Sequence, residues 1–160
     1  MTEYNVEIAK PEDENLIVDM FKLMHEENGI FNLSEDKVRD IVKMATSNKG
    51  GIIGLIKGEN SLEGMICLII DQLWYSEEWF LSELFNFVHP DFRRSSRVKS
   101  LLAFAKKCST EVHLPLVIGV VSNQRTEAKV KLYERQFPKA GAFFMYNGDY
   151  ARMGEHGFVS

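Results

Sequence analysis

The sequence predicts one α/β domain in which short strands and amphipathic helices alternate along the whole chain. The chain has 160 residues, of which 45% are hydrophobic and 11% aromatic, and this composition suits a single packed core. The hydrophobic pattern changes repeatedly between strand-like runs and helical spacing, in the order β-α-α-β-β-β-α-β-α-β. We found neither repeats nor linkers, so residues 1–160 are expected to form one domain.

The first third of the chain predicts a strand and two helices. Residues 4–9 alternate between apolar and polar side chains, as a half-buried strand does. Pro11 is expected to open the first helix, because proline is favoured in a first helical turn, and Gly29 marks the end of that helix. Ser34 is a suitable N-cap for the second helix.

The rest of the chain predicts five strands and two helices. Residues 52–57 and 62–71 form a hairpin pattern, and a third strand spans residues 80–88. A helix with one apolar face follows from about residue 98. The apolar run LVIGVV at residues 116–121 is typical of a strand covered on both faces. The remaining elements are a helix over residues 123–136 and a last strand over residues 142–146.

Charge and cysteine usage limit the classes of partner. The formal charge is −4, so the chain as a whole should repel nucleic acid. Cys67 and Cys108 both lie in apolar patterns, which indicates reduced, buried thiols, and no metal-ligand spacing joins them to the four histidines. Neither a signal peptide nor a membrane-spanning run is evident, so the expected location is the cytoplasm.

An arginine-rich turn between the third strand and the next helix is the strongest candidate for a binding site. It places arginines and serines where the first helical turn leaves backbone N–H groups without intrahelical partners. These N–H groups, the positive end of the helix dipole and the arginines together suit a phosphate-bearing ligand. The alternative is a solvated basic turn that the serines cap. The side chains concerned are Arg93, Arg94, Ser95, Ser96 and Arg97.

The segment VHPDFRRSSR and the helix after it resemble the acyl-CoA-binding segment of the GNAT superfamily of N-acyltransferases. That family's pattern is Arg or Gln, two variable residues, Gly, one variable residue, then Gly or Ala. A second stretch, with Asn123, Ala128 and then Leu-Tyr-Glu ending at Glu134, is similar to the family's downstream motif. The resemblance covers about residues 4–147. It implies a mixed, mostly antiparallel sheet flanked by helices.

The resemblance also implies which residues hold acetyl-CoA as co-substrate. The loop side chains named above and Val98 would bind the pyrophosphate, and backbone N–H groups of Phe87 and Val88 would face the thioester carbonyl. Asn123 would bond the cofactor arm or merely cap its helix. Two positions depart from the pattern. Ser96 replaces a glycine, although its hydroxyl can donate to a phosphate oxygen, and Val98 replaces a small residue, so that it narrows the site or turns into the core.

Two residues are candidates for proton transfer. Glu83 lies on the strand predicted at residues 80–88, near where family members often carry a base that deprotonates the acceptor amine. The alternative for Glu83 is a strand residue that faces solvent or pairs with a lysine. His89 is a second candidate base, although it could equally shape the turn. Tyr133 matches the tyrosine to which the family often gives the role of acid for the thiolate, but it also completes the apolar side of its helix.

The implied activity is transfer of an acetyl group to a primary amine of a small molecule or a protein. Acidic and aromatic residues between the first two helices would suit a cationic acceptor, or they are a solvated helix end: His25, Glu26, Glu27, Asn28 and Phe31. One alternative is an inactive binding module of the same fold that retains CoA. Another is nucleic-acid binding through the basic residues of the loop and its helix, which the acidic balance disfavours. The sequence predicts neither a metal site nor a membrane partner, and it predicts a monomer or a homodimer.

Overall fold

The structure, a computed structural model, describes residues 3–121 and 125–151. Its residues form two compact units. The first comprises Met1–Phe21 and Glu35–Ile118, and the second comprises Lys22–Ser34 and Gly119–Ser160. Within the described residues, no helix has the length and apolar character needed to cross a lipid bilayer.

The first unit is built on one sheet that, among the described residues, has five strands in the order β1-β2-β3-β4-β5. The first four strands pair antiparallel, while β5 lies parallel to β4. This confirms the expected mixed, mostly antiparallel sheet. The strands are β1 (Glu7–Ile8), β2 (Gly51–Lys57), β3 (Leu62–Gln72), β4 (Trp79–Val88) and β5 (Leu116–Val117).

The helices agree closely with the sequence pattern. Pro11 begins a short 3-10 turn, η1 (Pro11–Asp13), which leads directly into α1, because proline has a suitable φ and no N–H to leave unbonded there. The longer helices are α1 (Glu14–Asn28), α2 (Glu35–Thr46), α3 (Arg97–Val112) and α4 (Thr126–Glu134). Two further 3-10 turns are η2 (Pro90–Phe92) and η3 (Gly148–Ala151).

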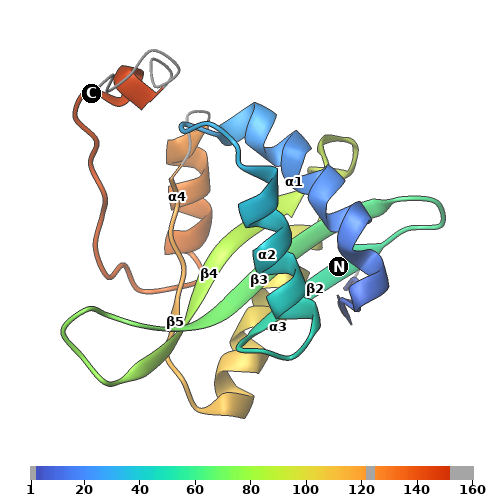
Figure 1. Cartoon of the computed structure of the whole chain (residues 1–160), viewed down its shortest axis with the longest axis horizontal. Helices are drawn as coiled ribbons and strands as arrows, with labels where there is room; N and C mark the ends of the chain where they lie inside the picture. The colour runs from blue at the N-terminus through green and yellow to red at the C-terminus, as the bar shows by residue number, and fades with distance from the viewer. Residues whose placement is uncertain (1–2, 122–124, 152–160) are drawn as a thin grey trace. The chain divides into compact units, whose positions relative to one another are not determined.

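Helices α2 and α3 cover opposite faces of the sheet (Figure 1). A Cβ atom at Gly51 would lie 3.2 Å from Ala45 of α2, whereas one at Gly54 would lie 2.7 Å from the Phe104 ring of α3. These two glycines are three residues apart on β2, so alternation puts them on opposite faces. Glycine is needed at position 54 because the Phe104 ring occupies the space that a side chain would fill.

The core of the first unit lies on both faces of the sheet. Under α3, six buried side chains form one cluster: Ile56, Ile66, Leu68, Leu81, Leu101 and Ala105. On the other face, Phe85 of β4 meets Phe21 of α1 edge to face, with ring centroids 5.4 Å apart. Burial of each large apolar side chain contributes about 1.5–3 kcal/mol, so this double-sided core fixes the position of β4 firmly.

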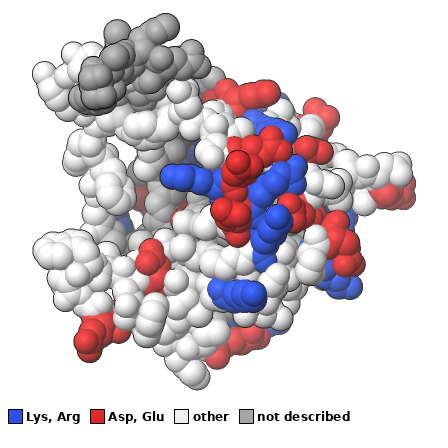
Figure 2. Space-filling model, in the orientation of Figure 1, with Lys and Arg blue, Asp and Glu red and all other residues white. Residues whose placement is uncertain are grey.

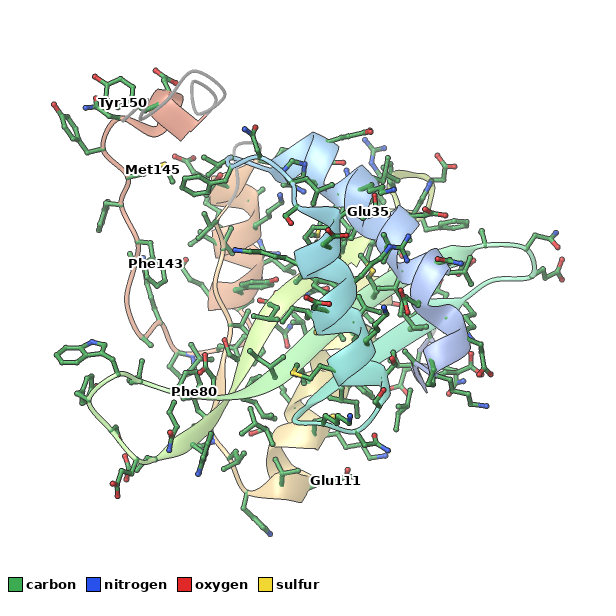
Figure 3. All side chains as sticks on the ribbon, viewed as in Figure 1. Glu35, Phe80, Glu111, Phe143, Met145 and Tyr150 are labelled. Atoms are coloured by element: carbon green, nitrogen blue, oxygen red, sulfur yellow. The ribbon has the colours of Figure 1, made fainter. Side chains whose placement is uncertain are left out.

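Two predicted strands differ from the structure. The run at residues 116–121 forms a strand only at Leu116–Val117, and Val117 and Val121 are exposed, so the expectation of a strand covered on both faces was wrong. Residues 142–146 form no strand in the described structure. Phe144 is 94% exposed, and Phe143 and Met145 project from an extended backbone (Figure 3). Apolar, β-prone composition signals a preference only, and a strand requires a neighbour to pair with.

Candidate functional site

The site begins where β4 ends, at a turn that His89 shapes. The His89 N–H donates to the Glu63 carbonyl at 2.8 Å, which keeps the end of β4 attached to β3. Beyond it, the N–H of Asp91 donates to His89 Nδ1 at 3.1 Å, and that of Phe92 donates to the His89 carbonyl at 2.9 Å. His89 therefore acts in η2 as a turn former, one of the two roles that the sequence left open.

The arginine-rich loop, residues 93–96, connects this turn to α3. The Arg93 guanidinium lies over the Phe87 ring, 5.3 Å from its centroid, and its Nε donates to the Val88 carbonyl at 3.3 Å. Ser95 Oγ donates to the Phe92 carbonyl at 2.7 Å and accepts from the Arg97 N–H at 3.3 Å. The loop therefore holds the first turn of α3, with its positive dipole end, close to the end of β4.

Arg94 and Ser96 complete this loop. Arg94 has a φ of 62°, a left-handed conformation that is uncommon for a residue with a side chain and that occurs often at functional sites. Its side chain is exposed. Ser96 is the N-cap residue of α3, and its carbonyl accepts the first helical hydrogen bond, from the Ser100 N–H at 3.0 Å. Val98, in the first turn, is half-buried.

Arg97 has a structural setting that the sequence did not reveal. Its Nε forms an ion pair with Glu63 Oε2 at 3.1 Å, and its Nη1 donates to Tyr4 Oη at 3.2 Å. The guanidinium also lies 4.1 Å from the Tyr4 ring centroid and 4.8 Å from that of Phe92. Both charged side chains are only 14% exposed. We call Tyr4, Glu63, Phe92 and Arg97 the Arg97 brace, because they tie the chain's first strand region, β3 and the loop together.

After its pairing with β5 ends, β4 has an edge whose backbone groups suit a ligand. Within the described residues, β5 pairs with β4 only at Leu81 and Ser82, while β4 continues for six more residues. Successive residues of a strand direct their backbone groups to opposite edges. Since the His89 N–H points to β3, the Val88 N–H and C=O point to the opposite edge, in agreement with the bond from Arg93 to the Val88 carbonyl. The Phe87 N–H then points toward β3.

A β-bulge lies at the middle of β4, beside Glu83. Leu68 of β3 is opposite Glu83 and Cys67 is opposite Phe85, so Leu84 is an extra residue on β4. Bulges bend a strand and are frequent next to active sites. The sequence analysis missed this feature, although the adjacent apolar pair Leu84 and Phe85, which interrupts the alternation, was the available signal.

Glu83 is half-buried at this bulge, and one of its carboxylate oxygens is shielded from solvent. The negative charge of Glu83 affects the pKa of a residue on the neighbouring strand, β3. Burial, with a smaller contribution from the negative charge of Glu83, raises the pKa of Cys67 to about 12. The predicted base is therefore partly buried on β4, and its role stays a prediction.

The other predicted residues belong to the second unit. Tyr133 lies on α4, partly buried, with its ring edge to face with that of Phe137 at 6.4 Å. Asn123 lies outside the described residues. Of the acceptor candidates, His25 Nε2 is 2.6 Å from the Phe31 carbonyl, and Asn28 Oδ1 accepts from Lys129 Nζ. These contacts order the segment between α1 and α2 within its own unit.

A cavity of about 260 Å³ in the first unit lies at the opposite end of α3 from the loop. Its lining includes Gly51, Leu68, Cys108 and Glu111, and Figure 3 shows Glu111 near the C-terminal end of α3. Burial raises the pKa of Cys108, so its thiol is protonated at neutral pH. None of the residues predicted for cofactor binding or catalysis lines this cavity.

Comparison of the structure with solved structures identifies the fold. The aminoglycoside N-acetyltransferase AAC(6')-Iy, in complex with a bisubstrate analogue of CoA, superposes with a TM-score of 0.71 at 12% identity, over 91% of this chain and 98% of that one. A predicted acetyltransferase with acetyl-CoA from Clostridium acetobutylicum gives 0.69 at 14% identity, over 89% and 95%. A GCN5-related N-acetyltransferase from Ralstonia eutropha gives 0.68 at 14% identity, over 89% and 97%. This chain has the GNAT fold.

The likeness to these structures is one of fold. Neither a protein-family model nor a curated protein sequence matches the chain. The GNAT fold accounts for the strand order and for the position of the loop between β4 and α3.

Proposed function

We propose that the protein is an acetyl-CoA-dependent N-acetyltransferase that acts on a primary amine. The observation that carries this proposal is the loop of residues 93–96, which holds the N-terminal turn of α3 close to the end of β4. Two of the solved structures with the same fold contain CoA or acetyl-CoA, which supports the choice of acyl donor.

The residues present fit the chemistry of acetyl-CoA. Its pyrophosphate is a compact anion, for which backbone N–H groups at a helix N-terminus are a suitable site. Arg94 adds an exposed guanidinium, and Ser96 adds a hydroxyl donor in place of the family's glycine. Arg97 acts differently in this proposal: its charge is balanced by Glu63, so it positions the loop while Arg93 and Arg94 supply positive charge.

Acetyl-CoA supplies an acetyl group activated as a thioester. In the proposed reaction, Glu83 accepts a proton from the acceptor, because an alkylamine with a pKa of about 10.4 is mostly ammonium at neutral pH. The Val88 N–H, on the edge of β4 opposite β3, donates to the carbonyl oxygen of the acyl group. The resemblance to the family assigns to Tyr133, a residue of the second unit, the proton that the departing sulfur takes up.

The test is acetyl-CoA binding by calorimetry to the wild type and to two matched variants. Ser96→Asp keeps a residue that caps helices well but adds a negative charge where the pyrophosphate should bind. Ser34→Asp makes the same change immediately before α2. We expect Ser96→Asp to weaken binding at least tenfold and Ser34→Asp to leave it unchanged. A wild type that binds no acetyl-CoA, or equal binding by all three proteins, would refute the proposal.

A second candidate is a module that binds CoA without catalysis. The observation that favours it is the loop itself, where Ser96 and Val98 occupy positions that the family gives to small residues. A panel of primary amines, with thiol release as the readout, separates the two functions. Acetyl-CoA binding with release of thiol by any amine supports the enzyme, and binding without release supports the module.

A further inference from the structure

The turn between β3 and β4 exposes an unusual group of aromatic side chains. We call it the aromatic tip, and it comprises Leu73, Trp74, Tyr75 and Trp79. Trp74 is 95% exposed and Tyr75 is 69% exposed, and about half of the surface of the other two is accessible. Figure 1 shows this turn extending beyond the helices that cover the sheet. Solvent-exposed groups of large apolar residues typically mark an interaction surface.

Hydrogen bonds hold the aromatic tip in a defined conformation. The Ser76 N–H donates to the Leu73 carbonyl and the Glu78 N–H donates to Ser76 Oγ, both at 3.1 Å. Across the turn, Gln72 Nε2 donates to the Glu77 carbonyl at 2.7 Å. The rings of Trp74 and Tyr75 meet edge to face with centroids 5.4 Å apart. An aromatic surface ordered before binding loses less entropy when a partner arrives.

The charge at the aromatic tip has one sign. Residues 71–79 read DQLWYSEEW, with three carboxylates and neither lysine nor arginine. Asp71, Glu77 and Glu78 are all exposed. By contrast, acidic and basic side chains are intermixed over α1 and α2 (Figure 2). A partner that complements the aromatic tip therefore carries positive charge together with apolar groups.

This combination selects one kind of partner. A cationic side chain can stack on Trp74 by a cation–π interaction while its charge is also attracted by Glu77 and Glu78. An anionic membrane surface would be repelled by the three carboxylates. A second copy of this chain would bring another acidic tip and a formal charge of −4. Trp and Tyr also dominate the binding energy of many protein interfaces.

We propose that the aromatic tip is a docking surface for a basic peptide segment in which lysine or arginine alternates with apolar residues. The surface is formed by the side chains of one rigid turn, so binding requires neither acetyl-CoA nor acetyl transfer. If the protein acetylates a protein amine, this surface would recruit the acceptor.

The experiment uses a fluorescein-labelled twelve-residue peptide of alternating lysine and leucine, with fluorescence anisotropy as the readout on the full chain. Two further peptides separate the contributions: alternating lysine and serine keeps the charge, and alternating glutamate and leucine keeps the apolar groups. We expect the lysine–leucine peptide to bind at least tenfold more tightly than either.

Variants assign that binding to the aromatic tip. Trp74→Ser with Tyr75→Ser should weaken it at least tenfold, and Glu77→Lys with Glu78→Lys should abolish it. Two controls remove similar groups elsewhere: Phe144→Ser deletes another exposed aromatic ring, and Asp40→Asn with Glu59→Gln deletes two exposed carboxylates. Both controls should bind as the wild type does. Circular dichroism verifies that each variant is folded.

Three results would overturn the proposal. The first is equal binding of the lysine–leucine peptide to the wild type and to either aromatic-tip variant. The second is binding to phosphatidylserine vesicles that depends on Trp74, which would make the turn a membrane contact. The third is a dimer of the wild type that dissociates in the Trp74→Ser, Tyr75→Ser variant, which would make it a self-association surface.

Discussion

The two ends of β4 differ in charge, burial and the way their side chains are held. The strand has ten residues and therefore spans about 30 Å. At its first end, Trp79 adjoins an exposed, acidic group of aromatic residues. At its last end, Val88 leads into the basic loop, and Arg97, the first residue of α3 after that loop, is bonded to Glu63 and Tyr4. The bulge with Glu83 lies between them.

Because its two ends differ in this way, one strand suits ligand binding at one end and partner binding at the other. At the Val88 end, polar side chains contact one another and the backbone, so a substitution there should affect stability and ligand binding together. At the Trp79 end, the exposed rings contribute little to the core, so a substitution should affect partner binding alone. The two ends also attract opposite charges, which suits an anionic acyl donor and a cationic acceptor.

The largest expected effect concerns the residue between the two ends. Glu83→Gln removes the proposed proton acceptor but preserves the size of the side chain. We expect kcat for amine acetylation to fall by about 10²–10⁴-fold, while the Kd for acetyl-CoA changes less than twofold. Steady-state kinetics and calorimetry on the same preparation measure both quantities. An unchanged kcat would show that another group accepts the proton.

Cys67, opposite the bulge, tests whether the middle of β4 is as buried as the structure indicates. A thiol with a pKa of about 12 has roughly a thousandfold less thiolate at pH 8 than one near pKa 9. We therefore expect Cys67 to resist iodoacetamide in the native protein and to react once the chain is unfolded in urea. Mass spectrometry of labelled peptides locates the modified residue. Rapid native labelling of Cys67 would contradict the burial.

The Arg97 brace should stabilise the Val88 end. Glu63→Gln leaves the partly buried guanidinium of Arg97 without its carboxylate, and we expect a loss of about 2 kcal/mol in the free energy of unfolding, with weaker acetyl-CoA binding. Glu14→Gln is the control, because it removes one ion pair of Arg39 while Glu35 remains bonded to that arginine. Urea unfolding compares the two, and equal losses would argue against a special role for the brace.

The smallest expected effect is at the Trp79 end. Trp74→Ser removes a side chain that is almost fully exposed, so the free energy of unfolding should change by no more than about 0.5 kcal/mol. Urea unfolding of this variant beside Glu63→Gln gives the comparison directly. A loss as large as that of Glu63→Gln would mean that the aromatic tip is part of the folded core.

The sequence predicted most of the first unit because its elements have strong local signals. Alternation in β1, the hairpin of β2 and β3, and the apolar face of α3 each depend on neighbouring residues in the chain. The strand expected at residues 142–146 failed because strand formation depends on a pairing partner, which composition does not encode. The same limit applies to β5, whose apolar run is longer than its paired part.

The sequence predicted only part of the candidate site. The loop was found because arginines and serines immediately before a helix favour the binding of an anion, whatever the rest of the fold. The ion pair between Glu63 and Arg97 was not found, since 34 positions separate the two residues and only the folded sheet brings them together. The choice of Val88 over Phe87 as the outward donor likewise needed the direction of the His89 N–H bond.

The extra residue at Leu84 has a consequence for how this protein tolerates insertions and deletions. Glu83 is opposite Leu68 and Phe85 is opposite the adjacent Cys67, so loss of Leu84 would leave both pairs, and the faces of their side chains, unchanged. It would remove the bulge, and with it the local bend and extra twist that separate Glu83 from the Val88 end of the strand. A single-codon deletion at position 84 would thus preserve the sheet but change the direction in which the proposed base lies from the proposed acyl-donor site.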